Sequence, residues 1–132
     1  MTTVLFACVH NAGRSQMAAA FFNAMVHPAR ARAVSAGTAP GNHVHPEVVV
    51  AMRQVGIDLT DAVPQRLTDE LASSANIVVT MGCGEACPVV PGAKRLDWEL
   101  PDPRGQDLNR VREIRDEIKR QVVSLIQAEG LQ

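Results

Sequence analysis

Two side chains that can act together on an oxyanion stand at the ends of one short segment, CVHNAGRS at residues 8–15. Cys8 can supply a thiolate nucleophile. The guanidinium of Arg14 can bind two oxygens of a tetrahedral anion at once, and the Ser15 hydroxyl can donate a hydrogen bond to a thiolate. The segment therefore predicts nucleophilic chemistry on a small anion. The competing interpretation is a buried structural thiol and an unrelated surface arginine.

The elements on either side of this segment would position both groups. Residues 3–7 form an apolar run that is typical of a buried strand. From Ser15 onward, Met17, Phe21 and Ala24 recur at helical spacing. Backbone N–H groups in a loop that enters a helix bind anions, and the positive end of the helix favours a nearby thiolate. We expect the anion to bind along the loop, at Val9, His10, Asn11, Ala12, Gly13 and Arg14.

The rest of the chain alternates between predicted strands and predicted helices. Strands are expected at 32–36, 75–80 and 94–98, and helices at 46–56, 68–73 and from 108 to 126. This alternation is typical of an α/β fold with right-handed crossovers. We expect a single three-layer domain over residues 1–132, in which a four-stranded parallel sheet carries helices on both faces. Ligands of such folds bind beyond the C-terminal ends of the strands.

Two further cysteines, Cys83 and Cys87, follow the predicted strand at 75–80. Clustered cysteines in a reducing compartment indicate redox or metal chemistry more often than structural bridges. A metal site would need further ligands such as His43 and His45, but the spacings are poor for zinc. We therefore expect no metal and place both histidines on a solvated loop. Two inert core thiols are the remaining alternative.

Composition narrows the function classes. A chain of 132 residues fits one domain with its own core. A net charge of −1 offers no broad positive field for DNA or RNA, so no nucleic-acid partner is expected. The chain shows no export signal and no stretch that could span a membrane. These features predict a cytoplasmic protein without a membrane partner, and they predict no particular oligomeric state.

Residues 8–15 resemble the phosphate-binding loop of the low-molecular-weight protein tyrosine phosphatase superfamily, and nearly the whole chain follows its order of elements. The arsenate reductase branch is more similar, through two motifs: TMGCGEACP at 80–88 and DWELPDPRGQ at 97–106. The resemblance implies arsenate as substrate, with phosphate or sulfate as competing anions. It also implies that Asp102, before Pro103, is the general acid for the leaving oxygen. From the residues alone, Asp-Pro is also typical of a turn.

The resemblance supports a relay of three cysteines, which we state as a hypothesis. Cys8 forms a thiol–arsenate adduct, Cys83 attacks Cys8 to release arsenite, and Cys87 attacks Cys83 to leave a disulfide. No bound cofactor is needed, because thioredoxin would reduce that pair. Only three residues separate Cys83 from Cys87, fewer than in the best-known thioredoxin-linked relatives. The alternative electron donor is therefore mycothiol or glutathione with a glutaredoxin-like protein.

Two other functions use parts of the same residue set. A tyrosine phosphatase would use Cys8, Arg14 and Asp102 in the same roles, but it would need aromatic walls around the substrate ring. The chain has no Tyr, one Trp and three Phe. A non-enzymatic anion-binding redox sensor would have no use for an acid at Asp102. The sequence therefore favours the reductase, with the catalytic set Cys8, Arg14, Ser15, Cys83, Cys87 and Asp102.

Overall fold

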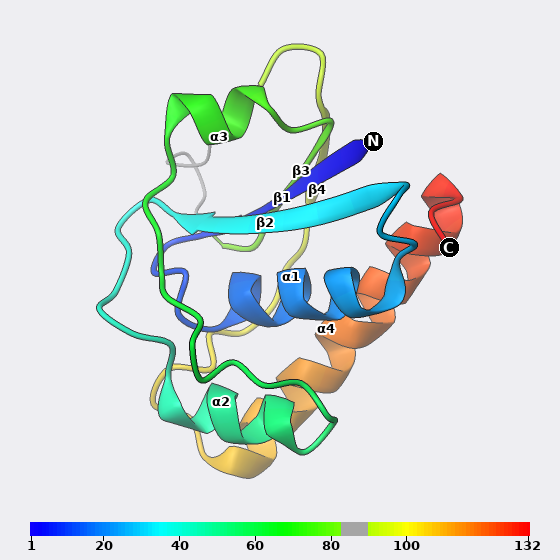
Figure 1. Cartoon of the computed structure of the whole chain (residues 1–132). Helices are drawn as coiled ribbons and strands as arrows, with labels where there is room; N and C mark the ends of the chain where they lie inside the picture. The colour runs from blue at the N-terminus through cyan, green and yellow to red at the C-terminus, as the bar shows by residue number, and fades with distance from the viewer. Residues whose placement is uncertain (83–89) are drawn as a thin grey trace.

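A parallel sheet of four strands forms the centre of the computed structural model, which describes residues 1–82 and 90–132 (Figure 1). The strands are β1 (Thr2–Cys8), β2 (Ala31–Gly37), β3 (Ile77–Thr80) and β4 (Lys94–Asp97). Their order is β2-β1-β3-β4, and each neighbouring pair is parallel. The predicted four-stranded parallel sheet is confirmed.

Helices cover both faces of the sheet. They are α1 (Arg14–Met25), α2 (Pro46–Arg53), α3 (Asp69–Ser73) and α4 (Leu108–Glu129). Figure 1 shows α1, α2 and α4 on one side of the strands and α3 on the other. The three-layer α/β architecture is therefore confirmed, and among the described residues the second outer layer has one helix, the five-residue α3.

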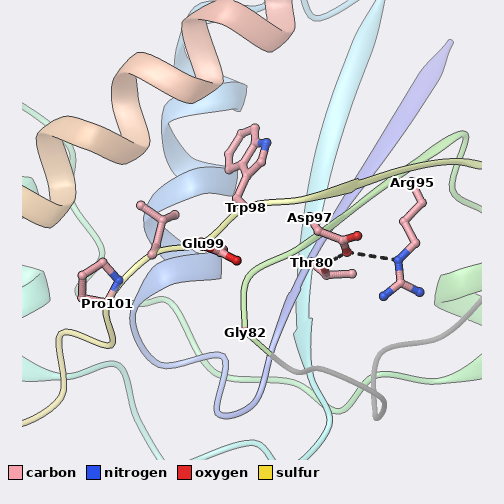
Figure 2. A pocket seen from close by; sticks show the side chains of 8 residues that line it. Thr80, Gly82, Arg95, Asp97, Trp98, Glu99 and Pro101 are labelled. Carbon is pink, nitrogen blue, oxygen red and sulfur yellow. Dashed lines mark hydrogen bonds and ion pairs between the residues drawn. The ribbon is translucent and has the colours of Figure 1, made fainter.

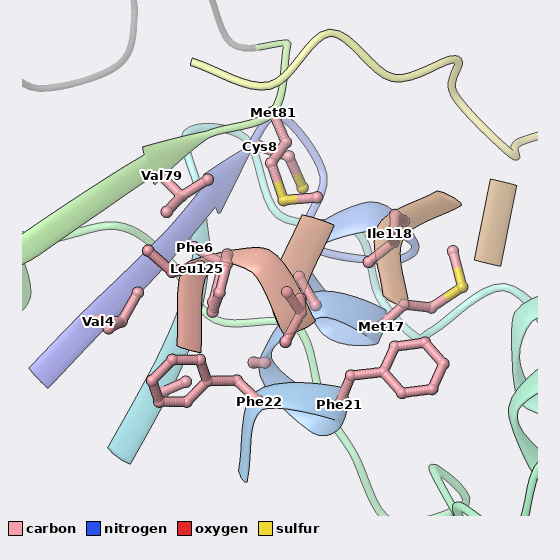
Figure 3. Packing of buried hydrophobic residues seen from close by; sticks show 14 of the residues in the cluster. Val4, Phe6, Cys8, Met17, Phe21, Phe22, Val79, Met81, Ile118 and Leu125 are labelled. Carbon is pink, nitrogen blue, oxygen red and sulfur yellow. The ribbon is translucent and has the colours of Figure 1, made fainter. Parts of the chain in front are cut away.

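The alternation of side chains along β1 decides which way Cys8 points. Val4, Phe6 and Cys8 belong to the large apolar cluster that includes α1 and α4, whereas Leu5 packs in the cluster on the opposite face. Figure 3 shows the first three residues along one strand, with Cys8 at its end and Met81 beside it. The two-residue period thus places Cys8 under the N-terminus of α1.

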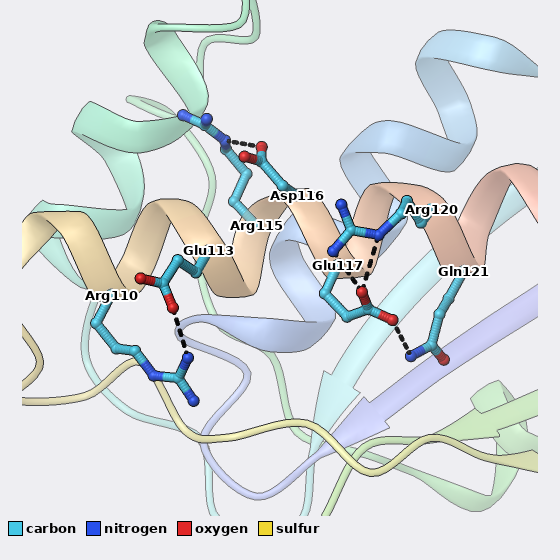
Figure 4. A network of polar contacts seen from close by, with 7 residues as sticks. All are labelled: Arg110, Glu113, Arg115, Asp116, Glu117, Arg120 and Gln121. Carbon is cyan, nitrogen blue, oxygen red and sulfur yellow. Dashed lines mark hydrogen bonds and ion pairs between the residues drawn. The ribbon is translucent and has the colours of Figure 1, made fainter.

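The long helix α4 has the ends and the stripe that its sequence predicts. The Asp107 side chain accepts a hydrogen bond from the Arg110 N–H at 2.8 Å, and Gly130 ends the helix in the left-handed conformation. Apolar residues at helical spacing face the core, while ion pairs such as Arg110 to Glu113 lie on the outer face (Figure 4). Within the described part of the chain, no helix combines the length and the apolar character needed to cross a bilayer.

One charged side chain is buried where α4 meets α2. Arg115 donates through Nη1 to the carbonyl oxygen of Ala51 at 2.8 Å and to Gln54 Oε1 at 3.3 Å. Its Nε donates to Asp116 Oδ1 at 2.9 Å (Figure 4). Ala51 lies in the last turn of α2, where carbonyl groups have no partner within the helix. Arg115 therefore caps α2 from a neighbouring helix.

Replacing Arg115 with methionine should lower the free energy of unfolding by about 1.5–3 kcal/mol, because the Ala51 carbonyl loses a charged donor in a buried place. Chemical denaturation followed by circular dichroism measures the change. The matched control is Arg120→Met, which removes an ion pair with Glu117 from the exposed side of the same helix and should change stability little. Equal losses in both variants would contradict the capping role of Arg115.

Candidate active site

The loop between β1 and α1 directs its carbonyl oxygens away from its interior. Each of the six carbonyl groups of residues 8–13 accepts a hydrogen bond from a donor that lies outside this segment. The acceptors and their donors, with N···O distances, are Cys8 and Thr38 (3.2 Å), Val9 and Ala39 (2.8 Å), His10 and Gly41 (2.9 Å), Asn11 and the Gln16 side chain (3.1 Å), Ala12 and His45 (2.9 Å), and Gly13 and Met17 (3.0 Å). The N–H groups of residues 9–13 have no acceptor among residues 1–82 and 90–132.

Such a loop is suited to an oxyanion, because N–H donors remain where the carbonyl oxygens have been turned outward. The N-terminus of α1 adds to this field. It begins at Arg14 without a side-chain cap from any described residue and without an acidic residue in its first turn. The positive end of the helix therefore remains available to a bound anion.

Cys8 lies at the base of this loop and is only 2% exposed. Its Sγ is 2.8 Å from Ser15 Oγ, and Asn11 Nδ2 is 2.7 Å from the same oxygen. The backbone N–H of Gln65 binds Asn11 Oδ1 at 2.9 Å, which fixes the orientation of the Asn11 amide. Ser15 accepts a hydrogen bond from that amide, so its single proton is left for the Cys8 sulfur.

Arg14 is 9% exposed, which excludes the interpretation as a surface arginine. Its Nη1 donates to the carbonyl oxygen of Leu100 at 3.3 Å, and its Nη2 lies 3.7 Å from Asp102 Oδ2. Arg14 stands at one end of the anion loop, and Leu100 and Asp102 lie 86 and 88 residues further along the chain. The guanidinium thus connects the two segments that the sequence assigned to anion binding and to acid chemistry.

Asp102 takes part in a local turn and also approaches Arg14. Its Oδ1 accepts a hydrogen bond from the Arg104 N–H at 2.9 Å, as in an Asp-Pro turn, while Oδ2 faces Arg14. The next residue, Pro103, packs against Gly13: a Cβ atom on Gly13 would lie 2.7 Å from Pro103 Cγ. The turn is therefore docked on the anion loop, with one carboxylate oxygen free of the turn.

Gly82, which follows β3, lies directly against the guanidinium. Its φ is +100°, and a Cβ atom there would come within 2.4 Å of Arg14 Nη1. Gly82 also lines an open pocket of about 810 Å³ at the C-terminal ends of β3 and β4 (Figure 2). The other residues that line this pocket are Thr80, Arg95, Asp97, Trp98, Glu99, Leu100 and Pro101. Cys83 and Cys87 lie outside the described residues.

Residues 3–131 match the family described as low molecular weight phosphotyrosine protein phosphatase. The chain belongs to this family. It is 41% identical over 128 residues to a putative arsenate reductase of Halobacterium salinarum, an alignment that covers 91% of this chain and 87% of the relative. It is 33% identical over 129 residues to a glutaredoxin arsenate reductase of Synechocystis, covering 96% of this chain and 97% of the relative.

Solved structures of the family show the same fold. A thioredoxin-dependent arsenate reductase of Corynebacterium glutamicum superposes with a TM-score of 0.85 at 39% identity, covering 97% of this chain. The chain spans 61% of the length of that structure. An arsenate reductase in a phosphate-binding state superposes with a TM-score of 0.84 at 30% identity, covering 97% of this chain and 98% of that one.

Asp97 and its neighbours give the pocket of Figure 2 a charged wall. The Thr80 hydroxyl donates to Asp97 Oδ1, and Arg95 Nε donates to the same oxygen at 3.1 Å. The hydrogen bond from Thr80 is the main cause that lowers the pKa of Asp97, and Arg95 lowers it further. Asp97 therefore stays negatively charged well below neutral pH.

His45 is a site residue that sequence reasoning missed. The structure confirms that His43 is exposed, but His45 is only partly exposed. Its Cδ2 lies 3.4 Å from where a Cβ of Gly13 would stand. His45 lies on the loop before α2, as predicted, but its ring is only partly solvated because the loop after β2 folds back onto the anion loop. No local pattern around His45 indicates this contact.

The charge state of His45 responds to the groups around it. Burial is the main cause that lowers the pKa of His45 from 6.5. The positive charges of Arg104 and His10 lower it further. The negative charges of Asp102 and Glu47 oppose this shift. With its pKa below 6.5, the imidazole is mainly neutral at pH 7.

The metal alternative involves His43, His45 and the two cysteines Cys83 and Cys87. Within residues 1–82 and 90–132, no group of three His, Cys, Asp or Glu side chains is placed to hold a metal ion. His43 and His45 were the candidate partners of Cys83 and Cys87 in a metal site, and the two cysteines lie outside these ranges. The relatives from Halobacterium salinarum and Synechocystis are named arsenate reductases.

Replacing Gly82 with alanine should weaken phosphate binding by about tenfold or more. The new Cβ would displace the Arg14 guanidinium, and a charge-assisted hydrogen bond contributes roughly 1.5–3 kcal/mol. Titration calorimetry with phosphate measures the loss. Gly92→Ala is the matched control, because Gly92 also has a positive φ, +84°, but nothing lies within 4 Å of its Cβ position. If both variants bind phosphate like the unmodified chain, Gly82 does not support Arg14.

Substitutions beside His45 should move its pKa in opposite directions. Asp102→Asn removes a negative charge that favours imidazolium, so the pKa of His45 should fall further below 6.5. Arg104→Ala removes a positive charge, so the pKa should rise toward 6.5. An NMR titration of the imidazole C–H resonances reports both shifts. An unchanged titration in Asp102→Asn would contradict the position of His45 beside the acid.

Proposed function

We propose that this protein is an arsenate reductase in which Cys8 is the nucleophile and Cys83 and Cys87 carry the electrons. Three features of the described site support the proposal. The buried Cys8 sulfur lies within hydrogen-bond distance of the Ser15 hydroxyl, outward-facing carbonyl groups leave N–H donors for a tetrahedral oxyanion, and a guanidinium lies beside a carboxylate. Relatives named arsenate reductase, at 30–41% identity, add independent support.

The observation that carries the proposal is the contact between Gly82 and Arg14. Gly82 is bonded to Cys83 in the chain, so an anion on the guanidinium is close to the residue that precedes the second thiol. A phosphatase needs a nucleophile and an acid but no second thiol, because water completes its reaction. A reductase must supply two electrons, and the chain offers a thiol next to this contact.

The first step joins sulfur to arsenic. The Cys8 thiolate attacks arsenate, an S–As bond forms, and one oxygen leaves as water. Asp102 supplies a proton to that oxygen, which is a poor leaving group without one. Arg14 and the loop N–H groups hold the remaining oxygens and stabilise the charge that develops on them. The product is a thiol–arsenate adduct.

The second step transfers the electrons. The Cys83 thiolate attacks Cys8 Sγ, the S–S bond forms as the S–As bond breaks, and the bonding pair stays on arsenic. Arsenic is thereby reduced from As(V) to As(III) and leaves as arsenite. Cys87 then attacks Cys83, which releases Cys8 as a thiolate and leaves a Cys83–Cys87 disulfide.

A thiol reductant must then reopen this disulfide with two electrons. We propose thioredoxin, because a superposable structure is described as a thioredoxin-dependent arsenate reductase. Mycothiol or glutathione with a glutaredoxin-like protein is the alternative, since one relative is named glutaredoxin arsenate reductase. A cytoplasmic setting fits either donor. Phosphate and sulfate should compete with arsenate, because the loop recognises shape and charge.

Aromatic side chains distinguish this proposal from a tyrosine phosphatase. Phe6, Phe21 and Phe22 are at most 3% exposed and lie in the core. The Trp98 ring packs at 50° against Phe6, with 5.7 Å between ring centroids. The three Phe rings are thus unavailable to a substrate, and Trp98, which is partly exposed and lines the pocket of Figure 2, is the one aromatic side chain near the site. A single aromatic wall favours a small inorganic anion over an aryl substrate. A redox sensor is disfavoured because it needs no carboxylate beside Arg14.

The deciding experiment is arsenate-dependent oxidation of NADPH in the presence of thioredoxin and thioredoxin reductase. Cys8→Ser should abolish turnover, because no adduct can form. Cys87→Ser should release about one arsenite per protein molecule and then stop, because the mixed disulfide between Cys8 and Cys83 cannot be resolved. The measurement is arsenite by mass spectrometry after a timed quench.

Hydrolysis of an aryl phosphate by the same preparation provides the comparison. Rapid phosphate release without arsenate turnover would replace the reductase with a phosphatase. Continued multiple turnover by Cys87→Ser would reject the three-cysteine relay while leaving a two-thiol reductase in place. Disulfide mapping after a single turnover identifies which pair has formed.

A further inference from the structure

A buried glutamine on α1 joins the anion loop to the segment before α3, and the proposed mechanism gives it no role. Gln16 is 8% exposed. Its Nε2 lies 3.1 Å from the carbonyl oxygen of Asn11, 3.1 Å from Asn11 Oδ1 and 3.4 Å from the carbonyl oxygen of Val63. All three partners are acceptors only, so the donor end of the amide must face them.

Gln16 supports a residue with an uncommon backbone conformation. The φ of Asn11 is +49°, a region that residues other than glycine rarely adopt, and its side chain is fully buried. Such conformations persist only where surrounding contacts hold them. Gln16 holds the backbone oxygen and the side-chain oxygen of Asn11 at the same time. The Gln65 N–H holds Oδ1 from the opposite segment.

These contacts fix which end of the Asn11 amide faces Ser15. With Oδ1 occupied by two donors, the Asn11 amide can present only Nδ2 to Ser15 Oγ, at 2.7 Å. The hydroxyl then acts as an acceptor toward Asn11 and as a donor toward Cys8 Sγ, at 2.8 Å. Hydrogen bonds in such a chain polarise one another, so a change at its start affects the bond at its end.

We propose that Gln16 is a positioning residue that sets the reactivity of the Cys8 thiolate, an inference that rests on the proposed role of Cys8 as nucleophile. Gln16 does not touch the sulfur. It acts through Asn11 and Ser15, by fixing which end of the Asn11 amide faces the hydroxyl. The Gln16 amide also donates to the carbonyl oxygen of Val63. The segment before α3 therefore helps to fix the orientation of Gln16, and through it the reactivity of Cys8.

The test measures alkylation of Cys8 by iodoacetamide at pH 7 in a Cys83→Ser, Cys87→Ser background, where Cys8 is the only thiol. Gln16→Met keeps the length of the side chain and removes its donor. Alkylation should slow about three- to tenfold, the amount expected from the loss of one buried hydrogen bond. The same reaction on the unfolded chain gives the reference rate.

Asn23→Leu is the matched control for the loss of an amide from α1. The Asn23 side chain binds the N–H of Ala33 at 2.8 Å and its carbonyl oxygen at 3.1 Å. Among the described residues, Asn23 makes no hydrogen bond to the anion loop. It should lower the melting temperature and leave the alkylation rate unchanged. A slowing equal to that of Gln16→Met would show a general loss of stability and overturn the inference.

A double-mutant cycle separates positioning from packing. In a Ser15→Ala background the last hydrogen bond of the chain is absent, so adding Gln16→Met should not slow alkylation further. An equal effect of Gln16→Met in both backgrounds would overturn the inference, and so would an unchanged rate in Gln16→Met alone. Both results leave the proposed function intact. If Cys8 with Gln16 present reacts no faster than in the unfolded chain, the proposed role of Cys8 as nucleophile fails instead.

Discussion

The site depends on the outward direction of six consecutive carbonyl groups, those of residues 8–13. A carbonyl oxygen that faced a bound oxyanion would repel it, and a buried carbonyl without a donor is costly. Both problems are solved by donors that surround the loop: backbone N–H groups in the segment after β2, the Gln16 amide and the first turn of α1. The long connection between β2 and α2 is therefore part of the anion site as well as a link between elements.

Close contacts bring the remaining chemistry to this loop. Pro103 packs on Gly13, and Gly82 lies on Arg14, in both cases so closely that a Cβ atom on the glycine would force its neighbour to move. The acid turn and the end of β3 thus approach the site from two directions. Asp102 keeps one carboxylate oxygen in its own turn and turns the other toward Arg14. One small change at either glycine should therefore disturb groups that are far apart in the sequence.

The polar groups around Cys8 form one connected set. Cys8 is buried among apolar residues on one side and meets the Ser15 hydroxyl on the other. The amides of Asn11 and Gln16 extend this contact away from the sulfur, so the donors around the nucleophile are oriented before any anion binds. Preorganised donors of this kind stabilise developing charge without reorganisation during the reaction. Within the described residues, no buried side-chain nitrogen or oxygen lacks a partner.

Sequence alone was enough for the strands, the helices and their parallel arrangement, because these follow from local periodicity. The joint action of Cys8 and Arg14 on an anion stays a prediction. The sequence also singled out Asp102 through resemblance, while the roles of Cys83 and Cys87 stay predictions. The tertiary structure alone decided that His45 borders the anion loop, that Gly82 lies on Arg14 and that Gln16 holds Asn11. The first two are contacts between distant segments, and the third depends on amide orientation and loop conformation. No local pattern encodes these features, because they arise only when the chain folds back on itself.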